Sequence, residues 1–152
     1  MGTRKLFPVF RLYKLLTVMM WGMSNSSFTV IETQNAPAPV GSYSQAVVVN
    51  GIVHVSGQIA INPSTGDLIT ESYDAEARQV MANVSAVIQA AGATMKDVYK
   101  VTIFLTDMAR FAEFDAIYSE YLSDPFPARG VLGVASLPKG VAVEVMAEAR
   151  LS

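Results

Sequence analysis

The sequence predicts one α+β domain of two layers, in which a single mixed sheet carries two helices on one of its faces. Short runs rich in valine and isoleucine predict strands, and two longer segments with apolar residues at helical spacing predict helices. Their order along the chain is strand, strand, strand, helix, strand, helix, strand, strand. No linker, repeat or low-complexity tract interrupts residues 28–152, which we expect to form one domain.

The first three strands come from alternating or valine-rich runs. "FTVIET" alternates and predicts a strand, whereas "NAPAPVGS", with Pro37 and Pro39, predicts an extended loop. "AVVVNGIVHVSGQIAI" contains two runs around Asn50-Gly51, the pair most typical of a two-residue hairpin. "NPSTGD" then predicts a turn.

The first helix is predicted to run from a cap at Asp74 to Ala91, and Gly92 is expected to end it. "VYKVTIFLT" predicts a buried strand, and a second helix is expected from about Arg110 to Leu122. The first helix has an apolar stripe of Ala77, Val80, Met81, Val84, Ile88 and Ala91, and the second has one of Phe111, Phe114, Tyr118 and Tyr121.

The last strands are predicted in "ARGVLGVAS" and "VAVEVMAEARL", with a turn at residues 137–140 between them. If both helices lie on one face of the sheet, the other face stays uncovered. It should carry many small and branched side chains that are too apolar for open water. We therefore expect another subunit to cover it.

Composition excludes several classes of function. Hydrophobic residues make up 51% of the chain and charged residues 16%, which argues against disorder. The net charge of −2 argues against nucleic acid as a partner. There is no cysteine and only one histidine, His54, so neither a cysteine nor a multi-histidine metal site is expected. A Ser-His-Asp triad would have to use His54, for which a structural role within a strand is the better interpretation.

Residues 1–27 are expected to be a leader or extension outside the fold. This segment contains Arg4, Lys5, Arg11 and Lys14, and the first acidic residue is Glu32. Its apolar run is too short to span a bilayer, so no membrane association is expected. It is either a transit peptide or an upstream extension with Met23 as the working start. We expect a cytoplasmic protein, or a mitochondrial or other organellar one if residues 1–22 are a transit peptide.

Candidate site residues each allow a plain structural interpretation. Arg129 in "FPARGVLGVASLPKG" is either a surface arginine or an anion receptor. Glu144 either belongs to a functional site or solvates the outer face of the last strand, and Asp115 could be a solvated helix residue. Tyr43 could be a packed loop aromatic. Ser56-Gly57 interrupts a strand, which often marks close approach by a ligand or another chain.

Taken together, the motifs resemble the RidA (YjgF) family of imine and enamine deaminases, from about Val30 to Leu151. The resemblance rests on "APAPVGSYSQA", "VHVSGQIAINPSTGDL", "EARQVMANVSAVIQAAGATMKDVYKVTIFLTDM", "FPARGVLGVASLPKG" and "VEVMAEA". It implies a chorismate-mutase-like α+β fold, a homotrimer and three pockets between subunits. It also implies hydrolysis of 2-iminopropanoate and 2-iminobutanoate to 2-keto acids and ammonia. Such imines arise from pyridoxal-phosphate dehydratases and damage other enzymes.

The resemblance also assigns roles. Arg129 matches the arginine that grips the substrate carboxylate, and Glu144 matches the glutamate that positions or activates water. Tyr43 matches the tyrosine that closes the pocket, and Gly57, next to Ser56, matches the glycine that lets the backbone approach. No metal or organic cofactor is implied.

Two positions depart from the family pattern. Val131 stands where many members have cysteine, so its backbone groups are the expected substrate contact. Asp115 stands where many members have asparagine, and a carboxylate there would repel a substrate carboxylate. Either Asp115 makes no direct contact with the substrate, or the substrate preference has changed.

Two other functions stay open. The chain could be a trimeric small-molecule binder or a stress protein with holdase activity that acts without turnover. Chorismate-mutase-like chemistry would need more than one well-placed arginine for its dianionic substrate.

Overall fold

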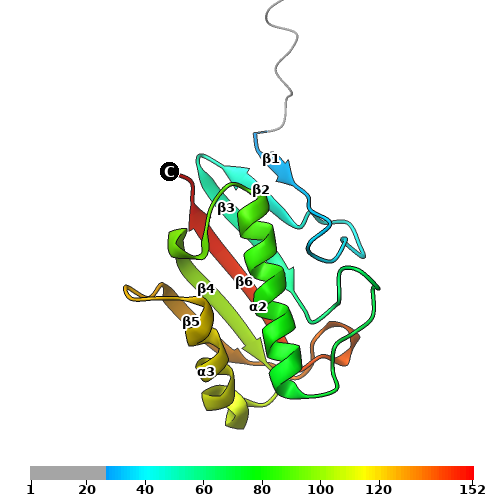
Figure 1. The fold of residues 1–152 in the computed structure, drawn as a ribbon. Helices are drawn as coiled ribbons and strands as arrows, with labels where there is room; N and C mark the ends of the chain where they lie inside the picture. The colour runs from blue at the N-terminus through cyan, green and yellow to red at the C-terminus, as the bar shows by residue number, and fades with distance from the viewer. Residues whose placement is uncertain (1–26) are drawn as a thin grey trace, which may run out of the picture.

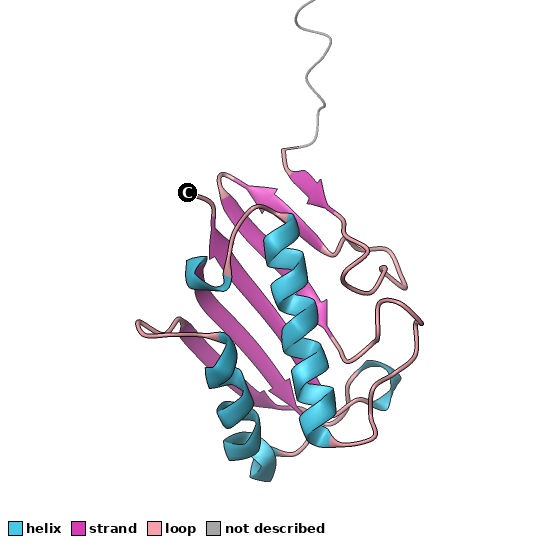
Figure 2. Cartoon of the chain, in the orientation of Figure 1, coloured by secondary structure: helices cyan, strands magenta, loops and turns pink. Residues whose placement is uncertain are grey.

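The computed structural model describes residues 27–152 as one six-stranded sheet with two helices across one of its faces (Figures 1 and 2). The strand order is β1-β2-β3-β6-β4-β5, and only the β4–β5 pair is parallel. The predicted α+β class, the mixed sheet and the order of elements along the chain are confirmed. The expected leader lies almost wholly outside the described residues.

The first three strands are β1 (Thr29–Ile31), β2 (Ala46–Val49) and β3 (Ile52–Gln58). At the β2–β3 turn, Asn50 has φ 51° and Gly51 has φ 77°. A two-residue turn that matches the right-handed twist of the strands needs positive φ at both positions, and asparagine and glycine tolerate it best. The predicted hairpin is confirmed.

The long helix α2 spans Tyr73–Ala90, and the predicted cap was wrong by two residues. The cap is Ser72, whose hydroxyl accepts a hydrogen bond from the Ala75 N–H at 3.1 Å. Asp74 lies in the first turn, where a carboxylate interacts favourably with the helix dipole without capping. At the other end Gly92 has φ 87°, the left-handed conformation expected of the glycine that ends a helix.

The remaining elements follow the predicted order. They are the short helix η2 (Met95–Asp97), β4 (Val98–Leu105), η3 (Met108–Arg110), α3 (Phe111–Tyr121), β5 (Ala128–Gly133), η4 (Pro138–Gly140) and β6 (Val143–Arg150).

The core lies between the sheet and the two helices. Alternate residues of β6 face the helices and are buried, because side chains alternate between the faces of a strand. These residues, Val143, Val145, Ala147 and Ala149, belong to one buried cluster with the α2 stripe of Val80, Met81, Val84, Val87 and Ile88.

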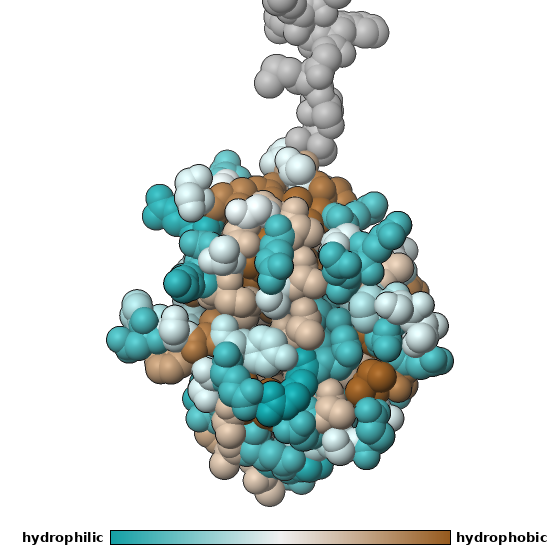
Figure 3. Space-filling model, in the orientation of Figure 1, coloured by the Kyte–Doolittle hydropathy of each residue, from teal (hydrophilic) through white to brown (hydrophobic). Residues whose placement is uncertain are grey.

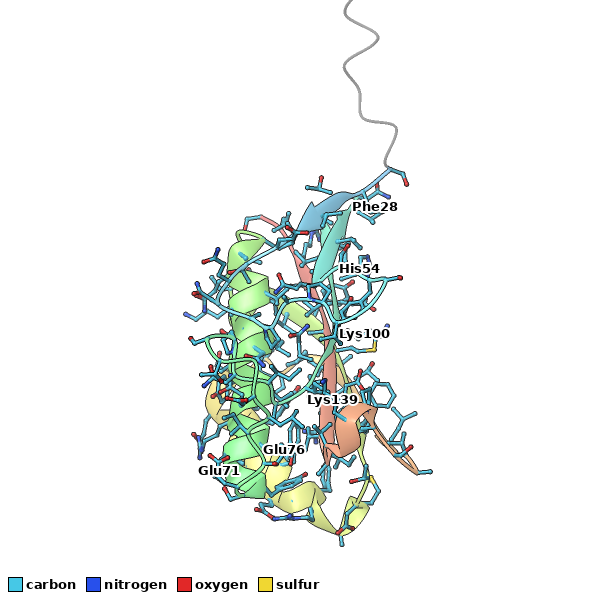
Figure 4. The ribbon with its side chains drawn as sticks, turned by 90° about the vertical axis from the view of Figure 1, so that its right-hand side faces the viewer. Phe28, His54, Glu71, Glu76, Lys100 and Lys139 are labelled. Carbon is cyan, nitrogen blue, oxygen red and sulfur yellow. The ribbon has the colours of Figure 1, made fainter. Side chains whose placement is uncertain are left out.

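Neither α2 nor α3 lies on the other face of the sheet, as the edge-on view of Figure 4 shows. The expectation that this open face is apolar is wrong at its centre. Lys100 pairs with Glu148 at 2.8 Å, the Tyr99 hydroxyl donates to Glu148 at 2.8 Å, and His54 lies opposite Glu148 in the sheet register. Exposed apolar side chains such as Leu132 and Met146 lie around this polar group.

The helix-covered side has a mainly hydrophilic and pale surface in Figure 3, with apolar side chains gathered near the end where β1 and β2 lie. Within residues 27–152, neither helix has the length and hydropathy that a membrane span requires.

Candidate active site

The predicted site residues fall into two separate cavities. The first has a volume of about 350 Å³ and contains Tyr43, Ser56, Gly57 and Glu144. It is otherwise mostly apolar, being lined also by Pro37, Val40, Gln58, Ile59, Ile61, Pro138, Lys139 and Met146. The second cavity, of about 400 Å³, contains Arg129 and Asp115.

Glu144 projects from β6 over the backbone of Gly57. A Cβ atom placed on Gly57 would lie 1.8 Å from Oε1 of Glu144, so only glycine leaves room for this carboxylate. Burial raises the pKa of the Glu144 carboxyl above its ordinary value. A carboxylate in such a setting is suited to accept a proton near neutral pH, because its basicity is higher than that of a solvated glutamate.

The loop that carries Tyr43 is tied to the sheet beside Glu144. The Ser56 hydroxyl donates to the Ser44 carbonyl at 2.6 Å, which links the loop to β3. The Tyr43 hydroxyl accepts from the Val40 N–H at 3.3 Å, and the side chain is 47% exposed. Tyr43 therefore lines the cavity and is partly exposed to solvent, and its role in closing the cavity stays a prediction.

Gln45 holds the same loop and was missed in the sequence. It is 2% exposed, and its side-chain amide donates to the carbonyls of Ala36 (3.1 Å) and Pro37 (2.8 Å). The same side chain exchanges two hydrogen bonds with the Thr33 backbone, at 2.7 and 3.0 Å. Pro37 lines the cavity, so Gln45 shapes one wall. A polar residue at the start of a valine-rich strand could have indicated this role.

Glu76 of α2 is a second residue that sequence reasoning missed. It is 5% exposed, and its carboxylate accepts from the backbone N–H groups of Ala142 (2.5 Å) and Val143 (3.1 Å). These bonds fix the start of β6, one residue before Glu144. An acidic residue four positions before Val80, on the apolar face of a helix, could have indicated this buried role.

Lys139 is the third residue missed in the sequence. It has φ 58° in the turn before β6 and lines the cavity together with Glu144. It is the one basic residue among the described residues that line this cavity. The labelled side chains of Figure 4 place Lys139 toward the side of the sheet away from α2.

The Arg129 side chain lies on the helix-covered face of the sheet, opposite to the face that carries Glu144. In the parallel β4–β5 register Arg129 is paired with Val101, which is buried under the helices. Glu144 is paired with Phe104, on the open face. Within one chain, the structure therefore does not bring Arg129 and Glu144 together.

Aromatic rings of α3 pack against the Arg129 side chain, which is 28% exposed. Its guanidinium carbon lies 5.2 Å from the ring centre of Phe111 and 5.1 Å from that of Tyr118, both favourable cation–π distances. Arg129 also forms an ion pair with Asp115. Val131 lines neither cavity, because its side chain packs against the core.

The chain is similar to known proteins over most of its length. Residues 33–151 match the family described as Endoribonuclease L-PSP. The human 2-iminobutanoate/2-iminopropanoate deaminase is 40% identical over 127 residues, which are 84% of this chain and 93% of the human protein. Among solved structures, RidA of an Antarctic Psychrobacter species has a TM-score of 0.78 and 42% identity, covering 81% of this chain and 99% of that one. Escherichia coli TdcF, solved with bound serine, has a TM-score of 0.77 and 36% identity over 82% of this chain and 99% of its own.

Proposed function

Because the chain belongs to the Endoribonuclease L-PSP family, the RidA family that its motifs resemble, we propose that it hydrolyses 2-imino acids to 2-keto acids and ammonia. The substrate class is that of 2-iminobutanoate and 2-iminopropanoate, the two imino acids for which the human relative is named. The role would be to remove reactive products of pyridoxal-phosphate dehydratases.

One observation carries this proposal: the half-buried Glu144 carboxylate in a mostly apolar cavity, held against the backbone of Gly57. A carboxylate with a raised pKa can take a proton from a water molecule and return it within the same reaction. The cavity is large enough for a four-carbon acid and a water molecule, and Tyr43 borders its solvent side.

The chemistry needs only proton transfer and orientation. The water oxygen bonds to the iminium carbon while the C=N π electrons move to nitrogen, and Glu144 takes the proton that the water releases. That proton then passes to nitrogen. The C–N bond breaks as the hydroxyl oxygen forms the carbonyl and gives its proton to Glu144, and the released ammonia takes this proton and leaves as ammonium. The iminium carbon is already electrophilic, so holding the two reactants in place supplies much of the rate.

Arg129 binds the substrate carboxylate in this proposal. A guanidinium offers two parallel charge-assisted hydrogen bonds that a lysine cannot reproduce. Since Arg129 and Glu144 face opposite sides of one sheet, we place the complete site between subunits of a homotrimer. Two features support this arrangement: β5 is an edge strand of the sheet, and neither α2 nor α3 covers the open face.

The test couples the protein to a threonine dehydratase and follows the loss of the imine. Glu144→Gln should lower kcat and leave 2-oxobutanoate binding largely intact. Arg129→Ala should lower kcat/KM by about 30-fold to several thousand-fold, because losing one partner of a desolvated charge pair costs roughly 2–5 kcal/mol. Arg129→Lys should recover part of that loss. A parent protein that binds 2-oxobutanoate without hydrolysing imine would favour the alternative, a binding or holdase protein.

A further inference from the structure

The half of the site around Arg129 already contains a carboxylate. Nη1 of Arg129 donates to Oδ1 of Asp115, across the contact between β5 and α3. The same guanidinium is packed against the rings of Phe111 and Tyr118. Because the ion pair and both rings restrict the Arg129 side chain, its charge has a defined place beside the charge of Asp115.

Both charges face one cavity. Its lining consists of Asp115, Tyr118, Ser119, Phe126, Pro127 and Arg129, so it holds one cation and one anion among the described residues. The buried Tyr118 hydroxyl has no hydrogen-bond partner within the described part of the chain. The pocket therefore has a charge-separated, dipolar wall, unlike the purely cationic wall of a simple anion receptor.

The guanidinium keeps donors for a ligand. Only Nη1 is engaged by Asp115, and among the described residues Nε and Nη2 donate to no acceptor. These two nitrogens lie on one edge of the planar guanidinium, and together they can donate two parallel hydrogen bonds to a carboxylate. A ligand bound there would have its carboxylate on Arg129 and its neighbouring atoms within reach of the Asp115 charge.

Substrate and product of the proposed reaction differ in charge at these neighbouring atoms. The reactive imino acid is protonated on nitrogen and carries a carboxylate, so it is a zwitterion with no net charge. The 2-keto acid product has the same carboxylate without the cation. The Asp115 carboxylate attracts the iminium group of the imino acid, whereas it only repels the anionic 2-keto acid.

We infer that Asp115 determines specificity at this site, by making the Arg129 pocket select zwitterionic 2-imino acids over anionic 2-keto acids. The inference rests on the proposed function, since it concerns the same site and the same reaction. The consequence is that the product binds weakly. After ammonia has left, the carboxylate of the 2-keto acid and the Asp115 carboxylate both lie beside Arg129, and no cation on the ligand offsets their repulsion. At an effective dielectric constant of about 20, two charges about 5 Å apart would change an affinity by roughly a hundredfold or more, and screening by solvent reduces this toward tenfold.

The experiment is calorimetric binding of a matched pair of probes, L-2-aminobutanoate as the zwitterion and 2-oxobutanoate as the anion. The parent should bind the zwitterion more tightly. Asp115→Asn keeps the side-chain shape, and it should shift the ratio of the two affinities at least tenfold toward the keto acid. Glu113→Gln is the matched control, because it removes one carboxylate from the same helix, where Glu113 pairs with Arg110. It should leave the ratio unchanged.

The outcomes separate this inference from the proposed function. If Arg129→Ala abolishes binding of both probes while Asp115→Asn leaves their ratio unchanged, the specificity role of Asp115 is refuted and the proposed function stands. If Arg129→Ala binds both probes as the parent does, Arg129 is no carboxylate receptor and both proposals are overturned. A parent that prefers 2-oxobutanoate also refutes the inference. Asp115→Ala carries the same expectation, should the asparagine variant not fold.

Discussion

Replacing Gly57 by alanine tests the position of the Glu144 carboxylate without removing it. The new Cβ would lie 1.8 Å from Oε1, 2.8 Å from Cδ and 3.2 Å from Cγ of Glu144. Ordinary van der Waals contact begins at 3.4 Å, so the carboxylate oxygen must retreat by roughly 1.5 Å to avoid overlap. The atoms that clash belong to the end of a side chain, which can rotate away without moving the sheet.

The expected result is a large loss of activity with little loss of stability. A reacting group displaced by about 1 Å can cost around a hundredfold in rate, or roughly 2.7 kcal/mol of transition-state stabilisation. We expect kcat in the coupled imine assay to fall by about this factor in Gly57→Ala. The free energy of unfolding should change by no more than about 1 kcal/mol, since the side chain rather than the backbone yields.

A double-mutant cycle identifies the cause. In a Glu144→Ala background no atom beyond Cβ stands over Gly57, so the added methyl should cost nothing further. If Gly57→Ala lowers kcat equally with and without the Glu144 side chain, the loss does not act through the carboxylate. If Gly57→Ala is as active as the parent, Glu144 is not the group that handles the water.

The remaining predictions concern stability, pH, assembly and cofactors. Burial raises the pKa of Tyr73 to about 12 and its buried hydroxyl has no partner among the described residues, so Tyr73→Phe should leave the free energy of unfolding unchanged or raise it by up to about 1 kcal/mol in a denaturant melt. A lower free energy of unfolding in the variant would show that the Tyr73 hydroxyl forms a stabilising hydrogen bond. Burial raises the pKa of Glu144, so the folded state holds this proton more tightly than the unfolded chain and stability should decline as pH rises from about 4 through the raised pKa. Glu144→Gln should remove that decline in melts across this range, and an identical pH profile would refute the assignment. Light scattering at micromolar concentration should give about three times the chain mass, whereas a stable monomer would exclude a site between subunits. Activity should survive exhaustive chelation, and a loss restored by added zinc or iron would overturn the cofactor-free mechanism.

Local patterns were enough to predict the elements of this fold. The Asn50-Gly51 turn was predictable from these two residues alone, because asparagine and glycine tolerate positive φ better than other residues do. The stripe that α2 buries and the order of the strands also followed from spacing in the sequence. The cap of α2 was misplaced, since Ser72 and Asp74 are both good capping residues and only the path of the chain selects between them.

The sequence, through its resemblance to a family, also predicted seven site residues. Four of them, Tyr43, Ser56, Gly57 and Glu144, line one cavity. Arg129 and Asp115 line a second cavity, and Val131 lines neither. Alternation in "ARGVLG" showed that Arg129 and Leu132 face opposite ways, but not which of them meets the helices.

Only the tertiary structure decided the rest. The parallel register of β5 against β4 turns Arg129 toward α3, where it meets Asp115, fourteen positions away in the chain. The antiparallel register of β6 turns Glu144 to the opposite face, above Gly57. Contacts of this kind depend on which strands are neighbours, and strand pairing is set by packing over the whole domain rather than by any local run of residues.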